Sequence, residues 1–566
     1  MVRIDQFLSR THIAYFSMEI ALCPEIHTYA GGLGVLAGDT ARSCADLQLP
    51  IVFVTLASRE GYMRQEIDEE GRQVELPDPW DPSEWTNPLD AKVALSIAGR
   101  EVWVRAWLYL VRSLLGERPL PVLLLDTDLE ENNLEDRTIT HCLYGGDETY
   151  RLKQEIVLGI GGVRILQALG FNITTFHLNE GHAALLTLDL LRRFRRAGED
   201  SDLGDSTLGR ARVRECSVFT THTPVGAGHD KFNYDLVEEL LDDFADIEDL
   251  KQLAGDDVLC MTQLALSLSG YVNGVAHRHA ETTRRVFPGH EVHAITNGVH
   301  VATWTHASFS RLYQASFPHW EHEPEALAQA DQLPDDAVWQ AHTESKSDLI
   351  ARVRTACGVE LDPDLPIIGF ARRMTGYKRP ELLFSDVERL VALAQDQPFQ
   401  VVLAGKAHPR DNDGKLLIEQ INRHIRKLAN QIRMVFVPNY DLTIAASFVA
   451  GSDIWLNTPL PPLEASGTSG MKAALNGVLN LSVLDGWWAE GCIEGVTGWA
   501  IGNGHEKDAA ADSQALYSKL AEQVLPLYHH KRSHWIWMMK QAISKIGSHF
   551  NTQRMVRRYA TEAYFR

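Results

Sequence analysis

The stretch DIWLNTPLPPLEASGTSGMKAALNG, residues 453–477, reads as strand, loop and helix in succession. DIWLN is apolar, the loop is rich in glycine and proline, and a helix is predicted to begin at about Met471. This geometry commonly holds phosphate on backbone amides. Lys472 stands out, because a cation in the first turn of a helix is electrostatically disfavoured. It would either pair with phosphate or form a Schiff base with an aldehyde cofactor, and spacing does not choose between them.

The same alternation of short apolar runs and helical stretches continues along the chain. The predicted strands are 50–56, 122–127, 174–179, 216–223, 292–296, 366–371, 399–405, 433–438, 453–457 and 478–485. Helices are expected at 151–169, at 443–451, and from about residue 530 onward. Continuous apolar strands separated by helices indicate parallel sheets covered on both faces. We therefore predict an α/β fold of two doubly wound Rossmann-like lobes, with ligands at the strand carboxyl ends in the cleft between them.

The length of 566 residues calls for at least two domains. We predict an N-terminal lobe at 1–305 and a C-terminal lobe at 306–544, with a helix at about 545–566 that packs back on the first lobe. The acidic, proline-containing stretch 318–345 is interpreted as the passage between the lobes. A helical insertion would have a similar composition.

The composition excludes several classes of function. The net charge of -21 argues against general binding of nucleic acid, which requires the opposite sign. The seven cysteines are an odd number without a C-x-x-C pair, which indicates reduced thiols and neither a disulfide framework nor a zinc site. There is no signal-peptide pattern and no apolar run long enough for a membrane span. We expect a cytoplasmic protein without a metal site.

A cluster of cations follows one predicted strand. GFARRMTGYKRPELLF, residues 369–384, places Arg372, Arg373, Lys378 and Arg379 close together in an otherwise acidic protein. Clustered cations repel one another unless they are solvated or share an anion. A solvated basic face is the alternative, but the position after a strand favours a phosphate site.

Two further motifs are open to both a structural and a functional interpretation. YAGGLGVLAGD, residues 29–39, would let the backbone turn tightly and offer amides to an anion, or it is a plain turn. In TTHTPVGAGHDKF, residues 220–232, His222 directly follows a strand and would face the cleft, or it packs or caps as single histidines often do.

EASGTSGMKAALNG, residues 464–477, closely resembles the cofactor loop of the α-glucan phosphorylases that act on glycogen, starch and maltodextrin. Other blocks match that family in the same order, and the resemblance runs from about Ile13 to about Glu490. It implies a two-lobed architecture of the GT-B glycosyltransferase type. The further matching blocks are AGGLGVLAGD, RLKQE, HLNEGHAAL, YVNGVAHRHAE, TNGVH, ARRMTGYKR, LAGKAHP and PNYDLTIA.

The resemblance also implies roles for individual residues. Pyridoxal 5′-phosphate would be bound as a covalent imine on Lys472, and Arg373 and Lys378 would hold the substrate phosphate. The implied catalytic residues are Lys472, His222, Arg373, Lys378 and Glu464. The other cofactor contacts would be Thr468, Ser469, Gly31, Gly32, Arg372, Tyr440 and Trp304. The glucosyl unit would be held by Glu464, Ser466, Gly467, Asn297, Tyr377, His222 and Leu33.

The implied reaction is phosphorolysis of α-1,4-glucan. Inorganic phosphate would release α-D-glucose 1-phosphate with retained configuration, and the cofactor phosphate would assist as acid and base. Two phosphates brought close in a low-dielectric cleft favour sharing a proton, as paired carboxylates do. The expected partners are α-glucan or maltooligosaccharide, inorganic phosphate and glucose 1-phosphate, and a homodimer is the expected assembly.

The sequence departs from the larger relatives in ways that leave the acceptor open. The resemblance implies that it begins almost directly at the first strand of the catalytic lobe, so we expect a short form without their N-terminal regulatory extension. Its cofactor loop reads Thr-Ser-Gly-Met-Lys in place of Thr-Gly-Asn-Met-Lys, and DGWWAEG replaces DGANVE. The alternative functions are a cofactor-free nucleotide-sugar glycosyltransferase, similar to glycogen or starch synthase, and a non-enzymatic glucan-binding relative.

Overall fold

The structure, a computed structural model, describes residues 4–114, 116, 118–198, 206–224, 228–504 and 508–565. The chain divides into two compact units: Met1–Tyr62, Pro77–Ile295 and Val556–Arg566 form the first, and Met63–Leu76 and Thr296–Met555 form the second. Each unit is described by itself below. The boundary predicted after residue 305 falls inside the second unit, as do residues 545–555 of the helix predicted to return to the first lobe.

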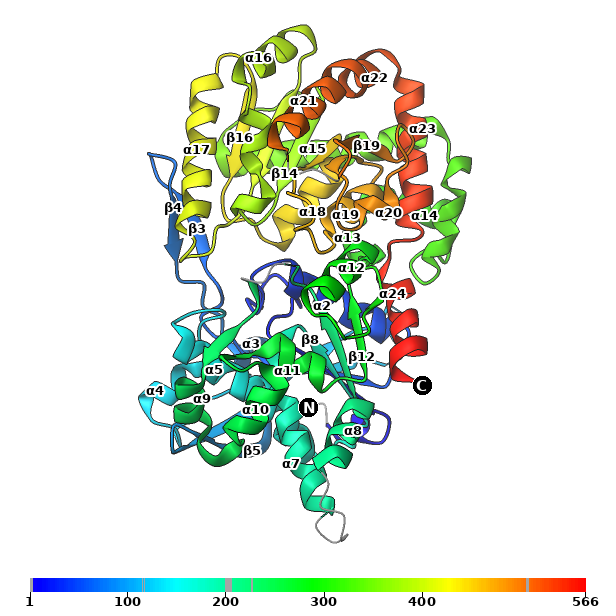
Figure 1. Cartoon of the computed structure of the whole chain (residues 1–566). Coiled ribbons are helices and arrows are strands. Elements are labelled where there is room, and N and C mark those ends of the chain that lie inside the picture. The colour runs from blue at the N-terminus through cyan, green and yellow to red at the C-terminus, as the bar shows by residue number, and fades with distance from the viewer. Residues whose placement is uncertain are drawn as a thin grey trace. The chain divides into compact units, whose positions relative to one another are not determined.

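A nine-stranded sheet forms the centre of the first unit (Figure 1). Its parallel strands β1, β2 and β7 are buried along their whole length, which explains why they are continuous apolar runs in the sequence. The five strands predicted in this half of the chain are confirmed as β2, β7, β8, β9 and β13. The sheet order is β13 (His293–Ala294), β12 (Tyr271–Gly274), β9 (Ser217–Thr221), β8 (Thr175–Asn179), β1 (Ile13–Ser17), β2 (Ile51–Leu56), β7 (Leu120–Asp126), β6 (Arg100–Val111) and β5 (Asn87–Ile97).

One edge of this sheet is antiparallel, a feature that the prediction of parallel sheets did not include. Strands β5 and β6 form a hairpin that pairs through β6 with β7. Ala98 and Gly99 connect them with φ angles of 53° and 68°, the left-handed values that a two-residue hairpin turn requires. β5 lies at the edge and is mostly exposed or half-buried, so it lacks the apolar run that identifies the inner strands.

The second unit is built on a six-stranded, fully parallel sheet. The five strands predicted in the second half of the chain are confirmed, and α18 (Leu442–Gly451) corresponds to the helix predicted at 443–451. Helices α15 (Asp335–Cys357) and α17 (Asn412–Leu428) are among those that pack with β16. The order is β16 (Arg433–Val437), β15 (Gln400–Ala404), β14 (Ile367–Ala371), β17 (Ile454–Asn457), β18 (Leu479–Val483) and β19 (Gly498–Ile501).

The stretch 318–345 is helical and lies wholly within the second unit, so its interpretation as a passage between lobes is wrong. It contains a 3-10 helix at Pro324–Gln332 and the start of α15. Leu327 and Val338 are fully buried there. The acidic residues that suggested a linker include Asp335 in the first turn of α15, where a negative charge stabilises the helix N-terminus.

Two short segments belong to a different unit from their neighbours in sequence. The hairpin of β3 (Arg64–Ile67) and β4 (Gln73–Leu76) is part of the second unit, although residues on both sides of it belong to the first. The last residues of the chain belong to the first unit. There the Tyr564 hydroxyl lies 2.6 Å from His177 Nδ1, in the buried strand β8.

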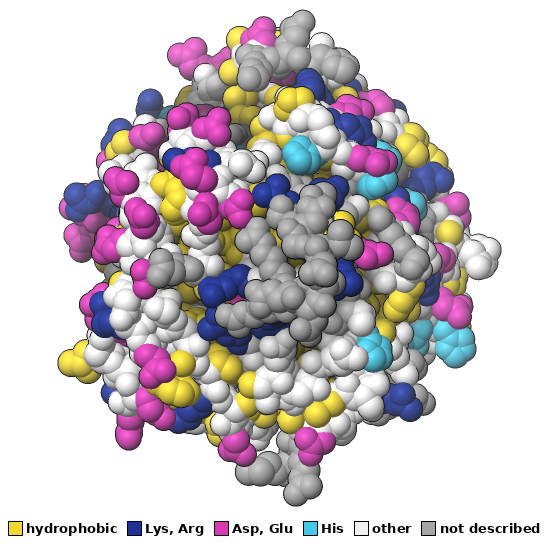
Figure 2. Space-filling view, turned by 60° about the horizontal axis from the view of Figure 1, so that its bottom comes forward, with side chains coloured by type: hydrophobic (Ala, Val, Ile, Leu, Met, Phe, Trp, Pro, Cys, Tyr) yellow, Lys and Arg dark blue, Asp and Glu magenta, His cyan; other side chains and the backbone are white. Residues whose placement is uncertain are grey.

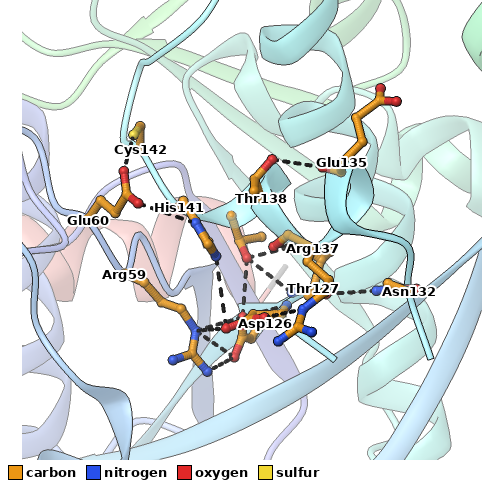
Figure 3. Close-up of polar contacts among 12 residues, drawn as sticks. Arg59, Glu60, Asp126, Thr127, Asn132, Glu135, Arg137, Thr138, His141 and Cys142 are labelled. Carbon is orange, nitrogen blue, oxygen red and sulfur yellow. Dashed lines mark hydrogen bonds and ion pairs between the residues drawn. The ribbon is translucent and has the colours of Figure 1, made fainter. Parts of the chain in front are cut away.

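A buried ionic network connects the ends of β2 and β7 in the first unit (Figure 3). The guanidinium of Arg59 donates to the buried carboxylate of Asp126, with Nη2 at 2.7 Å from Oδ2. Burial would raise the pKa of Asp126, but the hydrogen bond and charge of Arg59 outweigh it and lower that pKa. Nearby, the Cys142 thiol donates to Glu60, and burial followed by this carboxylate raises the thiol pKa to about 12. The charges are compensated and the thiol is not nucleophilic at neutral pH, so the network is structural.

The surface is consistent with the acidic composition. Figure 2 shows Asp and Glu side chains spread over one face, interspersed with lysines, arginines and histidines. Among the helices of the described residues, none has both the length and the apolar character that crossing a membrane requires.

Candidate active site

The predicted residues of the second unit follow the carboxyl ends of its parallel strands. Arg372 comes directly after β14, Tyr440 follows β16, and the loop at 458–468 leads from β17 to α19 (Ser469–Leu475). Because the carboxyl ends of parallel strands lie along one edge of a sheet, these segments share that edge, which is where ligands bind in open α/β sheets.

Glu464 forms the centre of a buried ionic cluster at this edge. Its Oε2 accepts hydrogen bonds from Arg372 Nη2 at 2.5 Å and from Lys378 Nζ at 2.6 Å. Burial would raise the pKa of Glu464, but the charges of Arg372 and Lys378 outweigh it and lower the pKa to about 2. Glu464 is therefore a carboxylate at physiological pH, and two cations share it. The structure brings Glu464 together with two predicted cations that precede it by 92 and 86 residues in the sequence.

Arg379 anchors the backbone that carries Lys378. It has a left-handed φ of 45°, and its buried guanidinium donates to the carbonyls of Thr458 and Pro459 and to Asp512 Oδ2 at 2.7 Å. In return, the Thr458 hydroxyl bonds to the carbonyls of Lys378 and Arg379. The loops after β14 and β17 are thus joined on both sides of Lys378. Arg379 therefore has a structural role in holding these two loops together.

Lys472 is buried, and its ammonium group lies over an aromatic ring. Its Nζ is 3.7 Å from the centroid of the Trp304 ring, a cation–π contact. The Asn476 amide bonds to the carbonyls of both Trp304 and Lys472, which fixes the two residues relative to each other. The helix begins at Ser469, before the predicted start at Met471, and has only seven residues, so Lys472 lies in its last turn, where a cation is electrostatically favoured.

The loop between Glu464 and Lys472 is held by contacts from β18 and the residues that follow it. The Glu464 amide donates to Asp485 Oδ2, and the Trp487 amide donates to the Ser466 carbonyl. Gly467 has a φ of 76°, which glycine adopts without strain. The Ser469 hydroxyl accepts a hydrogen bond from the Trp455 indole at 3.0 Å, and its own proton remains available to donate.

The remaining predicted residues of this unit differ in exposure. Arg373 is exposed, and Tyr377 is half-buried with its ring 4.6 Å from Lys378 Nζ. Tyr440 is half-buried with its ring edge-on to Phe448. Asn297 is buried, and its side-chain oxygen has no hydrogen-bond partner among the described residues. A buried amide oxygen of this kind can accept a hydrogen bond from a hydroxyl group of a ligand.

In the first unit, His222 follows β9 and is held by two residues at the end of β8. Its Nε2 lies 2.6 Å from Asn179 Oδ1, and its backbone amide donates to Glu180 Oε2 at 2.7 Å. Burial, followed by the neighbouring histidines, lowers the pKa of His222 to about 3, so the imidazole is neutral. Since Asn179 Oδ1 can only accept, Nε2 carries the proton and Nδ1 is an acceptor. Residues 225–227 of this predicted loop lie outside the described residues.

The glycine-rich loop of the first unit opens α2 (Gly32–Asp46), with Leu33 half-buried in its first turn. The Gly31 amide, predicted to be available to an anion, donates to Glu19 Oε2 at 3.0 Å. The Ala30 amide shares this carboxylate, which holds the loop in place. At Gly32 an added Cβ would meet no atom within 4 Å, so space is open beside the helix start.

These features fit an anionic group and a carbonyl cofactor. Arg372 Nη1 is buried without a hydrogen-bond partner among the described residues, and two cations share one carboxylate at Glu464. A phosphate would satisfy the orphaned guanidinium N–H. Lys472 supplies a buried primary amine, the group that attaches pyridoxal phosphate. In contrast, the described residues contain no group of three or more His, Cys, Asp or Glu side chains able to hold a metal ion.

Sequence reasoning missed the residues that hold the predicted ones in place. Asn179 and Asp485 are the last residues of the predicted strands 174–179 and 478–485, and in the structure they bond to His222 and Glu464. A polar residue that ends an apolar strand was the available signal, because such a side chain lies at the ligand-binding edge. No comparable signal pointed to Glu19, because its contact with the amides of Ala30 and Gly31 exists only in the folded chain.

Two α/β units built on largely parallel sheets, with cations and a carboxylate at a strand carboxyl edge, are typical of a glycosyltransferase of the GT-B class. The family model described as carbohydrate phosphorylase matches residues 228–490. Maltodextrin phosphorylase from Thermococcus litoralis is 38% identical, over 98% of this chain and 70% of that protein. Glycogen phosphorylases from Aquifex aeolicus and Mycobacterium tuberculosis are each 35% identical over 98% of this chain, and over 86% and 71% of their own length. The chain belongs to the carbohydrate phosphorylase family.

Proposed function

We propose that this enzyme cleaves α-1,4-glucan with inorganic phosphate and releases α-D-glucose 1-phosphate with retained configuration. The observation that carries the proposal is the buried cluster in which Arg372 and Lys378 share Glu464 while Arg372 Nη1 is unsatisfied. Such a cluster is suited to accept a phosphate beside a sugar-binding carboxylate. The names of the relatives, maltodextrin phosphorylase and glycogen phosphorylase, support the same reaction.

The carbohydrate phosphorylase family uses pyridoxal phosphate, and we propose that Lys472 attaches it in this chain. Trp304, which lies over the lysine side chain, and Tyr440 would contact the cofactor, with Arg372 at its phosphate. The other proposed contacts are Thr468, Ser469, Gly31 and Gly32. When bound, the cofactor supplies a phosphate group that assists proton transfer.

The cations then have a defined task toward the substrate phosphate. Lys378 and Arg373 would bind it, and an arriving phosphate would compete with Glu464 for the Lys378 ammonium. Glu464 would thereby become available to accept hydrogen bonds from the hydroxyl groups of the sugar. Since the pKa of Glu464 is lowered to about 2 by its cationic neighbours, the group remains an acceptor throughout the neutral range.

The sugar would be oriented by neutral acceptors and donors rather than by a nucleophilic carboxylate. His222 Nδ1 and the unsatisfied Asn297 Oδ1 are suited to accept sugar hydroxyls, and Ser466, Gly467, Tyr377 and Leu33 complete the proposed set. Inorganic phosphate gives its proton to the departing glycosidic oxygen as that bond breaks, and a phosphate oxygen bonds to the anomeric carbon. The oxocarbenium-like transition state gains from the adjacent anions and the carbonyl dipole at His222.

The proposal includes a cytoplasmic location and a homodimeric assembly. Size-exclusion chromatography with light scattering would test the assembly. The acceptor is a glycogen-like polymer, a short maltodextrin or another glucoside. Initial rates with maltooligosaccharides of increasing length would distinguish the first two.

The decisive experiment combines cofactor detection with product analysis. The purified protein would be scanned for the absorption of pyridoxal phosphate, reduced with borohydride and mapped by peptide mass spectrometry. It would then be incubated with maltodextrin and phosphate, and glucose 1-phosphate would be measured. The proposal predicts a pyridoxyl adduct on Lys472 and phosphate-dependent product. Absence of both after addition of pyridoxal phosphate, with activity on a nucleotide sugar instead, would refute it.

A further inference from the structure

Gln65 lies in the β3–β4 hairpin, which belongs to the second unit although the chain on both sides of it belongs to the first. The side chain is only 1% exposed. A buried primary amide requires partners for two N–H groups and a carbonyl oxygen. Gln65 finds them on two loops that follow β15 and β16 at the ligand-binding edge of the second unit.

The first partner is Asn439, in the loop after β16. The Gln65 backbone amide donates to Asn439 Oδ1 at 3.1 Å, and the Asn439 backbone amide donates to Gln65 Oε1 at 3.0 Å. The pair is reciprocal, with each side chain bound to the other residue's backbone. Asn439 has a φ of 55°, a left-handed conformation that costs free energy in any residue other than glycine and must be held by its surroundings.

The second partner is the loop after β15. Gln65 Nε2 donates to the Gly405 carbonyl at 2.9 Å and to Gln73 Oε1 at 2.8 Å. Gln73 in turn exchanges two hydrogen bonds with the backbone of Ala407. The orientation of the Gln65 amide is determined by this set, because the reverse orientation would place its NH₂ against the Asn439 N–H.

The loop held in this way supports the loop that carries the cations. The Arg372 amide donates to the Ala404 carbonyl at 3.2 Å, and the Met374 amide donates to the Lys406 carbonyl at 3.0 Å. Gly405 packs so closely that an added Cβ would lie 1.9 Å from the Arg372 carbonyl oxygen. A shift of Gly405 therefore moves the backbone of Arg372 as well.

On the Asn439 side the next residue is Tyr440, and the one after it, Asp441, caps α18 through Ile444 N. The backbone of Tyr440 is thus placed between two constrained neighbours. Gln65 therefore forms hydrogen bonds with both the Tyr440 loop and the loop that supports Arg372.

We propose that Gln65 is a positioning residue that sets Tyr440 and the Arg372–Arg373 loop in register for binding the cofactor and phosphate. The inference rests on the proposed function, and Gln65 itself touches no reacting group. Removing its amide would leave the peptide groups of Gly405 and Asn439 without these partners and let both loops shift. A misplacement of about 1 Å in a binding loop is enough to weaken catalysis substantially.

The test compares Gln65→Leu with a matched control, Asn422→Ala. Asn422 Nδ2 bonds to the Gly71 carbonyl at the tip of the same hairpin, so its loss weakens the hairpin without touching either loop. A second variant, Asn439→Gly, keeps the left-handed backbone accessible and removes only the acceptor of the Gln65 amide. For each protein we would measure the Kd for pyridoxal phosphate by absorbance titration of the stripped chain, KM for phosphate and for maltodextrin, and the Tm.

We expect Gln65→Leu and Asn439→Gly to raise the cofactor Kd and the phosphate KM by about tenfold, with KM for maltodextrin little changed. Asn422→Ala is expected to leave all three constants at wild-type values. A lowered Tm in Gln65→Leu with unchanged cofactor Kd and phosphate KM would overturn the inference, as would equal effects in Asn422→Ala. Failure of the proposed function is separately visible, because the wild-type chain would then bind no cofactor and form no glucose 1-phosphate; the inference would fall with it.

Discussion

The Lys378 ammonium lies 2.6 Å from Glu464 Oε2, and both groups are buried. Removing one partner of such a buried ion pair strongly destabilises a protein, because the other charge is left buried and uncompensated. The intact pair, in contrast, contributes little net stability. The pair is therefore better suited to respond to a ligand than to stabilise the fold. A phosphate that draws Lys378 away from Glu464 changes the charge of the site without leaving either group unpaired, and this makes Glu464 a sensitive probe.

The first prediction concerns the acid stability that Glu464 contributes. Its pKa falls from about 4.5 in the unfolded chain to about 2 in the fold, so its contribution is present above pH 4.5 and is lost as the pH falls toward 2. Between pH 6 and pH 3 the loss through this group should be about 2 kcal/mol. Chemical denaturation at both pH values would measure it. Glu464→Gln should lack this increment, and an equal pH dependence in both proteins would contradict the assignment.

A second prediction separates attachment of the cofactor from folding. Lys472→Ala should abolish the absorption band and the borohydride-fixed adduct and should lower phosphorolysis at least a thousandfold, because activity depends on the attached group. The lost contact with the Trp304 ring should cost about 1 kcal/mol in stability. Lys415→Ala, which removes only the ion pair with Glu75, serves as the lysine control and should retain the band. A wild-type band in Lys472→Ala would place the cofactor elsewhere.

The third prediction tests the contacts of Arg379 that hold the backbone next to Lys378. Asp512→Ala leaves the buried Arg379 guanidinium without its carboxylate and should destabilise the protein by about 3 kcal/mol. Because Arg379 also bonds to the carbonyls of Thr458 and Pro459, its displacement should raise KM for phosphate more than KM for glucan. Asp512→Asn keeps an acceptor and should fall between wild type and Asp512→Ala in both properties. If Asp512→Ala were destabilised but showed wild-type kinetics, the Arg379–Asp512 ion pair would have a role in stability alone.

The fourth prediction concerns the protonation of His222. Its pKa is lowered to about 3, chiefly by burial, so the imidazole should stay neutral throughout the active pH range. Hydrogen–deuterium exchange at the histidine C2 position, followed by mass spectrometry from pH 5 to 8, should show no titration of His222. Exposed His319 provides the comparison and lies outside the proposed site. A titration midpoint of His222 near 6.5 would mean that the imidazole acts as a cation or a proton donor.

Much of the fold was predictable because buried parallel strands appear in the sequence as continuous apolar runs. All ten strands predicted from apolar runs exist, since a strand covered on both faces must be apolar along its length. The edge strand β5 escaped prediction because half of its side chains contact water. The stretch 318–345 was misinterpreted because its polar residues lie on the outward side of helices whose apolar residues are buried.

The candidate site divides along the same line. The sequence by itself determined which chemical groups stand at the strand ends, because Arg372, Lys378 and Lys472 are placed by short segments whose structure is local. Only the tertiary structure decided which groups meet. Glu464 reaches Arg372 across 92 residues of sequence, and Gln65 reaches Asn439 across 374. Hydrogen bonds and ion pairs at such separations depend on how strands order themselves within a sheet, and a linear pattern of residue types does not specify that order.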